Sequence, residues 1–101
     1  MSSDAEIDQL LKEQQQEGRV LQRAARIMMR ALRTSADLTR AQMGERLGVG
    51  EETVRDLETG RRGVSLDDPA KWAIATNKDP RLTLQQIYGW RDLERHPRKP
   101  R

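Results

Sequence analysis

Residues 38–60, LTRAQMGERLGVGEETVRDLETG, decide the fold of this chain. Thr39 followed three residues later by Gln42 is a capping-box pattern, in which a hydroxyl and an amide side chain satisfy backbone amides at a helix start. Met43 and Leu47, four residues apart, lie on one side of the helix that begins there. The pattern therefore predicts a short helix with one apolar side.

Glycines define where this helix ends. Gly48 and Gly50 offer two positions that tolerate a positive φ, with Val49 between them as an apolar plug, and such a sequence suits a tight turn. We expect the first helix to stop at Gly48. Within that helix, Gly44 is small enough to let a crossing helix approach closely.

A second short helix follows the turn. Val54 and Leu57, three residues apart, give it a single buried edge, and Gly60 supplies its C-cap. Two short helices joined by a glycine-flanked turn form a helix-turn-helix.

The stretch resembles the XRE family, the helix-turn-helix domains of phage repressor and Cro type. The residues that carry the resemblance stand at the family's spacing without a gap: Leu38, Thr39, Met43, Gly44, Leu47, Gly48, Val49, Thr53, Val54, Leu57, Glu58 and Gly60. With its flanking helices the resemblance covers about residues 20–76. It implies an all-α fold, a compact lambda-repressor-like bundle of about five helices, here with an N-terminal helical extension.

Composition limits the other possibilities. The chain has 101 residues with two Trp, one Tyr and no Phe, which predicts one small domain with an aliphatic core. It has no cysteine and one histidine, His96, which excludes disulfides, thiolate metal sites and catalytic triads. We expect no enzyme activity, no catalytic residue, no metal and no cofactor. No apolar run approaches about 18 residues and no signal-peptide pattern is present, so we expect a cytoplasmic protein without membrane contact.

The net charge of +3 is mild but unevenly distributed. Residues 1–18 carry five acids against one lysine, whereas residues 19–36 carry five arginines and no acid, so the charge changes from −4 to +5. The last seven residues, RHPRKPR, have the composition of a flexible basic arm that either touches phosphates or stays solvated. We therefore expect an acidic N-terminal extension (1–18), a helix-turn-helix domain (19–94, with the motif at 38–60) and a basic tail (95–101).

The region before the motif predicts a strongly amphipathic helix. Its arginines recur at spacings of 4, 3, 4 and 3 and fall within an arc of about 80°, at Arg19, Arg23, Arg26, Arg30 and Arg33. Without a binding role, this arginine stripe is either a solvated helix face or pairs with the acidic N-terminal segment. Upstream, Ile7, Leu10 and Leu11 indicate an acidic helix that is either continuous or hinged near Gly18. This segment is either a dimerisation arm with those three apolar contacts or a frayed extension.

Two more helices are expected after the motif. Asp68 resembles an N-cap with Pro69 at the first helical position, which predicts a helix from Pro69 to about Thr76. The family prefers Leu, Ile and Leu where this chain has Pro69, Trp72 and Thr76. Thr83 is the expected cap of a final helix, and the apolar side of that helix is marked by Leu84, Ile87, Tyr88 and Leu93.

The resemblance implies that the second helix of the motif enters the major groove of DNA. By position, Glu51, Glu52 and Asp56 match the residues that read bases, and helix 51–59 has a net charge of −3. A carboxylate offers only acceptors, so it can pair with a cytosine N4 or adenine N6 donor but never with guanine O6. The expected phosphate anchors are Arg40, Arg61, Arg62 and Lys71, and the whole predicted DNA-binding set is Thr39, Arg40, Gln42, Gly50, Glu51, Glu52, Thr53, Arg55, Asp56, Thr59, Arg61 and Arg62.

One ion pair is implied by the same resemblance. In relatives the residue at the place of Glu58 pairs with an arginine on the first helix, and Arg33 stands at the matching place here. We expect this pair to be partly buried, bidentate and structural.

Two classes of function follow. The first is a sequence-specific transcriptional regulator that binds double-stranded DNA at an operator as a homodimer. The second is a helix-turn-helix scaffold repurposed for a protein partner, an antiactivator, adaptor or antitoxin-like regulator, whose acidic Glu51, Glu52 and Asp56 meet a basic surface. RNA binding along the arginine stripe and phage structural roles remain as further alternatives.

Overall fold

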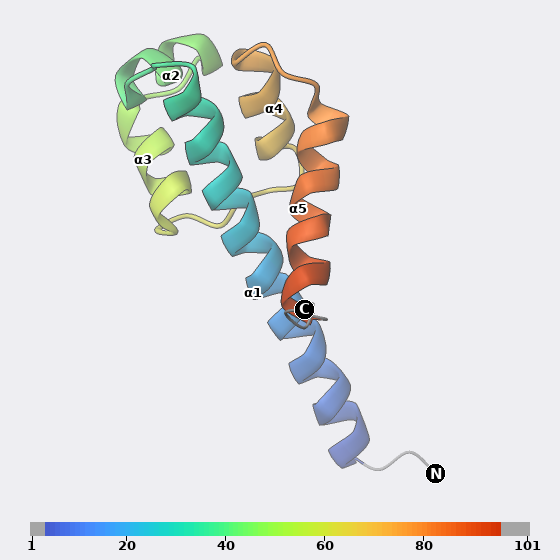
Figure 1. Ribbon diagram of the computed structural model, residues 1–101. Coiled ribbons are helices and arrows are strands. Elements are labelled where there is room, and N and C mark those ends of the chain that lie inside the picture. Colours follow the sequence, from blue (N-terminus) through green and yellow to red (C-terminus); the bar gives the residue numbers. More distant parts are fainter. Residues whose placement is uncertain (1–3, 96–101) are drawn as a thin grey trace.

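The computed structural model describes residues 4–95, with side chains for all of them except Glu17 and residues 91–95. This range forms five helices, namely α1 (Asp4–Ser35), α2 (Arg40–Leu47), α3 (Glu51–Thr59), α4 (Asp68–Ala75) and α5 (Pro80–Arg95), and contains no strand (Figure 1). The predicted all-α bundle of about five helices is therefore confirmed. None of the helices in this range is long and apolar enough to cross a membrane.

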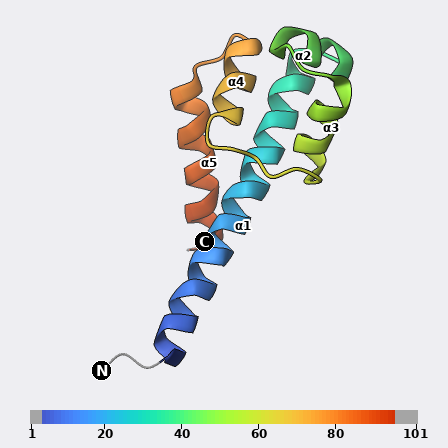
Figure 2. The same cartoon turned by 180° about the vertical axis from the view of Figure 1, so that it is seen from behind.

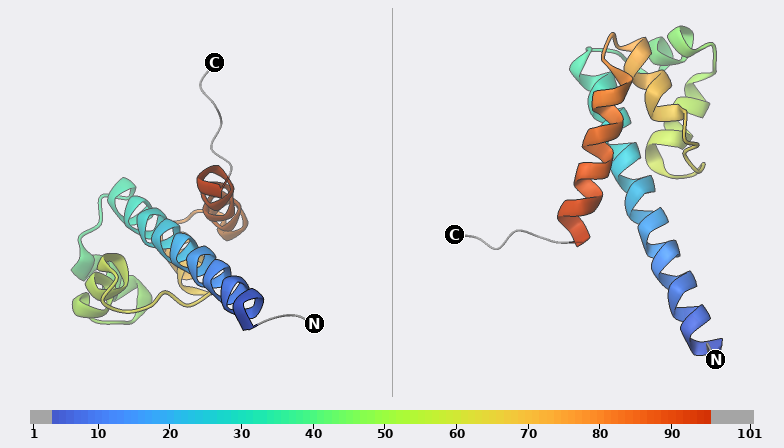
Figure 3. Two further views of the ribbon diagram at one scale, coloured as in Figure 1. Left: turned by 90° about the horizontal axis from the view of Figure 1, so that it is seen from below. Right: turned by 90° about the vertical axis from the view of Figure 1, so that its right-hand side faces the viewer.

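The long helix α1 is the axis of the molecule. Its C-terminal half packs against α3, α4 and α5, while α2 packs on α3 and α4 (Figures 1 and 2). Its N-terminal half extends beyond the other helices, as both views in Figure 3 show. The helix runs through Gly18 without interruption, so the continuous alternative holds and no hinge is present.

A mixed core joins the helices. Met29, Met43, Val54 and Trp72 are its largest fully enclosed side chains, and Trp72 is only 2 % exposed. The predicted aliphatic core is therefore correct for most positions but wrong at Trp72, whose indole ring is buried among the aliphatic side chains. Pro69 and Thr76, the other two departures from the family pattern, are also buried, so α4 packs its unusual residues inward.

The ends of α2 follow the local chemistry of the sequence. The Thr39 hydroxyl oxygen accepts a hydrogen bond from the backbone N–H of Gln42 at 3.1 Å. The backbone N–H of Thr39 donates in return to the side-chain oxygen of Gln42, Oε1, at 2.9 Å. At the other end, Gly48 adopts a left-handed conformation with φ of 71°. The predicted capping box and stop are both confirmed.

The turn itself differs from the prediction. Gly50 has φ of −76° and is the extended N-cap of α3, so only one of the two glycines needs a positive φ. Val49 is 41 % exposed and is not a plug. Gly44 was expected to face a crossing helix, but it faces the turn: a Cβ at this position would lie 2.6 Å from the Val49 carbonyl oxygen. The small residue therefore makes room for the turn backbone and not for a crossing helix.

Gly44→Ala should consequently destabilise the domain although alanine favours helices. The added methyl group meets rigid backbone, and relieving such an overlap costs about 1–3 kcal/mol. Gly89→Ala is the matched control, because nothing lies within 4 Å of the added carbon on α5, and it should be neutral or stabilising by up to about 1 kcal/mol. Urea denaturation of both variants measures the difference, and equal stabilities would contradict the close approach.

The starts of α4 and α5 correct two details. Helix α4 begins at Asp68 with Asp67 as its N-cap, and the Asp68 carboxylate accepts instead from the Ser65 amide at 2.8 Å. Thr83 does not cap α5, because the helix already begins at Pro80 and the Asp79 carboxylate accepts from the Arg81 amide. A buried Thr83 donates its hydroxyl to the Asp79 carbonyl oxygen at 3.2 Å. The preceding Asp-Pro pair, and not the threonine, starts the helix.

The predicted apolar side of α5 is only partly buried. Ile87 lies in the core and Leu84 is half-buried, whereas Tyr88 is exposed. The side chain of Leu93 lies outside the described residues, and so does the predicted basic tail apart from the backbone of Arg95.

Candidate nucleic-acid interface

Helix α3 presents its first turn and one side to solvent. Val54 and Leu57 anchor the opposite side in the core, and the helix ends at Gly60 in a left-handed C-cap. The predicted buried edge and C-cap are confirmed. Among the candidate base readers, Glu51 and Glu52 are exposed, so the acidic end of α3 faces outward.

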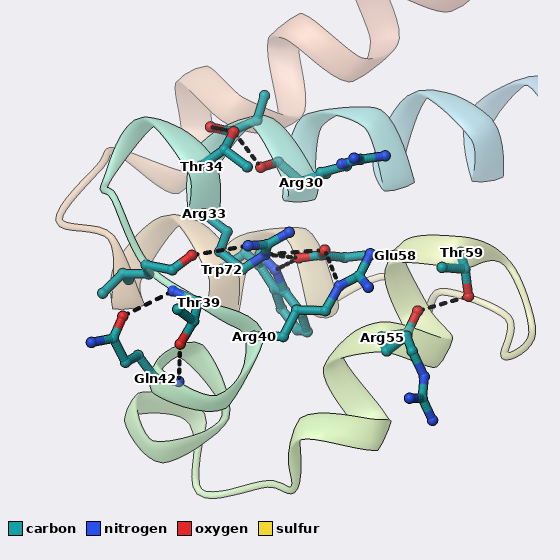
Figure 4. A network of polar contacts seen from close by, with 12 residues as sticks. Arg30, Arg33, Thr34, Thr39, Arg40, Gln42, Arg55, Glu58, Thr59 and Trp72 are labelled. Atoms are coloured by element: carbon teal, nitrogen blue, oxygen red, sulfur yellow. Dashed lines mark hydrogen bonds and ion pairs between the residues drawn. The ribbon is translucent and has the colours of Figure 1, made fainter.

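The start of α2 lies beside α3. Thr39 and Gln42 use a hydroxyl and a carbonyl oxygen for the capping box (Figure 4). Within the described part of the chain, the capping box occupies only the oxygen of the Gln42 side chain, which leaves its NH₂ group as a donor.

A buried carboxylate on α3 joins four helices. Arg33 Nε donates to both oxygens of Glu58, at 2.8 and 3.1 Å, and its NH1 group donates to the Leu38 carbonyl oxygen at 2.9 Å. Glu58 also accepts from Arg40 Nε at 3.3 Å and from Trp72 Nε1 at 3.3 Å (Figure 4). Its side chain is fully buried, while those of Arg33 and Arg40 are 11 % and 28 % exposed.

This network departs from the expected pair in two ways. The predicted contact of Arg33 with both oxygens of Glu58 is present, but both bonds come from a single guanidinium nitrogen, Nε. Trp72 and Arg40 also join Glu58, and sequence spacing did not predict either contact. Because two guanidinium groups share one carboxylate, the cluster keeps a net charge of +1 next to the start of α2.

Comparison with known proteins agrees with this geometry. A family model described as a helix-turn-helix domain matches residues 18–73, more than half of the chain. The chain belongs to this helix-turn-helix domain family. The resemblance to the XRE family is thereby confirmed. No curated protein and no solved structure matches the chain.

The other residues predicted to bind DNA differ in how many contacts they make within the domain. Arg55 is exposed, Thr53 is half-buried, and the Thr59 hydroxyl donates to the Arg55 carbonyl oxygen at 2.7 Å. Asp56 is partly enclosed, and its Oδ1 has no hydrogen-bond partner within the described residues; Arg55 Nε lies 4.0 Å away. A donor from outside the domain would satisfy this oxygen only after a small rearrangement, because the atom is covered.

The loop after α3 supplies exposed cations. Arg61 and Arg62 are exposed, and the structure shows no ion pair for either side chain within residues 4–90. The Arg62 amide donates to the Asp56 carbonyl oxygen at 3.1 Å, which holds the loop against α3. Lys71 is engaged elsewhere, in an ion pair with Asp67 at 3.1 Å. The Ser65 hydroxyl and then Lys71 hold the pKa of the exposed Asp67 below its ordinary value.

One contact between α1 and the loop before α4 could not be predicted from the sequence. Gln22 on α1 accepts from the Val64 amide and donates to the Val64 carbonyl oxygen, both at 2.7 Å. A glutamine on the polar edge of a helix looks solvated in the sequence, and only the return of the chain at Val64 gives it a partner.

Proposed function

We propose that this domain is a sequence-specific, DNA-binding transcriptional regulator that works as a homodimer at an operator. The observation that carries the proposal is a helix-turn-helix whose second helix has an exposed start, with exposed Arg61 and Arg62 directly after its last turn and Arg40 at the start of α2. Phosphate contacts from residues beside a groove-binding helix set its register on the duplex.

Within the groove, the exposed acids of α3 act as acceptors. Glu51 and Glu52 pair with cytosine N4 or adenine N6 donors and reject guanine O6, and Arg55 supplies a donor for guanine. The net repulsion between these acids and the phosphates lowers non-specific affinity, so a larger share of the binding free energy comes from matched bases.

Dimerisation doubles the site that is read. Two copies present two recognition helices to the major groove of one duplex, so the operator is a palindrome whose half-sites lie one helical turn of about 34 Å, or a multiple of it, apart. Occupancy of an operator that overlaps a promoter then regulates transcription.

Selection of bound fragments from a random double-stranded DNA library at about 150 mM salt tests the proposal, because non-specific phosphate binding is already weak there. We expect an enriched palindrome. Glu52→Ala should change the preferred base at one position of each half-site, by about 1–3 kcal/mol, and leave the salt dependence of affinity nearly unchanged. Repeating the selection with this variant and with Glu45→Ala on α2 as a control measures the shift.

A protein partner is the second candidate, and the acidic surface of Glu51 and Glu52 favours it. A basic protein surface would be attracted to these side chains. A folded protein that enriches no DNA sequence in the selection would contradict the first function, and a partner whose binding is lost in Glu51→Lys/Glu52→Lys would support the second.

A further inference from the structure

One face of α1 changes character from acidic to basic along its length. Residues at spacings of 4, 3, 4, 3, 4 and 4 lie within an arc of about 80°, so they share this face of the helix. They are Asp4, Asp8, Leu11, Gln15, Gly18, Gln22 and Arg26, with Ile7 and Arg19 at the edges. The acids and apolar residues occupy the projecting end, and the arginines occupy the end on the helix bundle.

The two ends cannot meet within one chain. Helix α1 is continuous, and at 1.5 Å per residue Asp4 and Arg26 are about 33 Å apart along its axis. Pairing of Arg26 with Asp4 therefore requires a second molecule.

A groove lies at the basic end of this face. It has a volume of about 440 Å³ and is open to solvent, and it is lined by Gln15, Gly18, Arg19, Gln22 and Arg26. Nothing lies within 4 Å of a Cβ added at Gly18. Another helix can therefore approach α1 closely at this point.

The projecting end offers a matching shape and charge. Ile7 and Leu11 are 48 % and 51 % exposed, and Leu10 on the adjoining side is 61 % exposed. Asp4 and Asp8 flank Ile7 and Leu11 on the same face, and both carboxylates are exposed. An acidic segment with an apolar centre complements a groove lined by two arginines.

We propose that the groove of one copy receives the N-terminal segment of a second copy, residues 4–11, in an antiparallel α1–α1 pair. With Gln15 at the twofold axis, Asp4 of each copy lies opposite Arg26 of the other, and Leu11 lies opposite the aliphatic stem of Arg19. The same contact forms twice, because an antiparallel pair of identical helices is self-complementary. This inference specifies the interface of the proposed homodimer and rests on that part of the proposed function.

Sedimentation velocity of the full chain without DNA tests the interface. We expect a dimer that weakens as salt rises, because charge pairs contribute to it. Leu11→Lys and Asp4→Arg/Asp8→Arg should each raise the dimer dissociation constant at least ~10-fold, since each places like charges in the contact. Leu82→Lys is the control, because Leu82 on α5 is 57 % exposed and lies outside the groove.

A charge swap separates this interface from a general loss of structure. Arg26→Glu should weaken the dimer, and combining it with Asp4→Arg, the residue opposite it, should restore at least part of the affinity. Circular dichroism melts verify that each variant is folded. A monomeric wild-type chain, a dimer that Leu82→Lys disrupts while Leu11→Lys does not, or a swap that restores nothing would overturn the proposal. DNA binding is absent from this experiment, so its failure is independent of whether the domain binds DNA.

Discussion

Glu58→Ala should lower the free energy of unfolding by about 3–5 kcal/mol, because it leaves Arg33 buried without its counter-ion. The same change removes the acceptor of the Trp72 indole N–H at the centre of the core. An uncompensated charge and an unpaired donor both oppose folding, and a small domain has only about 5–15 kcal/mol of stability to lose.

Urea denaturation of the wild type, Glu58→Ala, Arg33→Ala and the double variant measures this effect. The double variant should be more stable than the sum of the single losses implies, with a coupling of about 1–3 kcal/mol, since each single change leaves the other member of the pair without its counter-ion. Glu45→Ala, an exposed glutamate on α2, is the control and should stay within about 0.5 kcal/mol of the wild type. If Glu58→Ala does not fold, Glu58→Gln replaces it, because the amide keeps an acceptor for Trp72. A decrease of less than about 1 kcal/mol in the free energy of unfolding of these variants would contradict a structural role for the network.

Arg61→Ala/Arg62→Ala should weaken binding to every DNA sequence by at least about tenfold at 150 mM salt and flatten the slope of log K against log salt by about 2. Both side chains are exposed, and neither has an ion pair in the described part of the chain. Their positive charges are thus available to neutralise phosphates, and their removal eliminates the release of about two counter-ions. Base preference should not change, because phosphate contacts carry no direct sequence information.

Fluorescence anisotropy titrations with the selected operator, at several salt concentrations, measure the affinity and slope. Arg81→Ala is the matched control, since Arg81 is exposed at the start of α5, away from α3 (Figure 1). Arg40→Ala is a poorer probe, because Arg40 also bonds to Glu58 and its loss disturbs the buried network. An unchanged slope for Arg61→Ala/Arg62→Ala would contradict the proposed phosphate contacts.

Local chemistry explains which predictions from sequence succeeded. The capping box of Thr39 and Gln42 forms between neighbours in the chain, and the left-handed stops at Gly48 and Gly60 depend on single residues. Helical periodicity likewise identified Val54 and Leu57 as the buried edge of α3, because burial on a helix follows its 3.6-residue repeat.

Errors arose where a residue's role depends on a distant part of the chain. Gly44 faces the turn backbone and not a helix, and Val49 points outward, because the path of the turn sets both environments. The candidate interface shows the same limit. Position in the motif suggested Arg40 as a phosphate anchor, but the approach of α2 to α3 adds an ion pair with Glu58.

The amino-acid pattern alone was therefore sufficient for the helix-turn-helix and its caps, because these depend on contacts within about one helical turn, and the family resemblance supplied the five-helix bundle. Only the packed structure assigned Trp72 and Arg40 to Glu58, tied Gln22 to Val64, and aligned the acidic and basic ends of α1 on one unbroken helix. Those features require residues 14 to 42 positions apart to meet, or an entire helix to stay straight. The periodicity of side chains along a helix carries no information about which distant residue will pack against that helix.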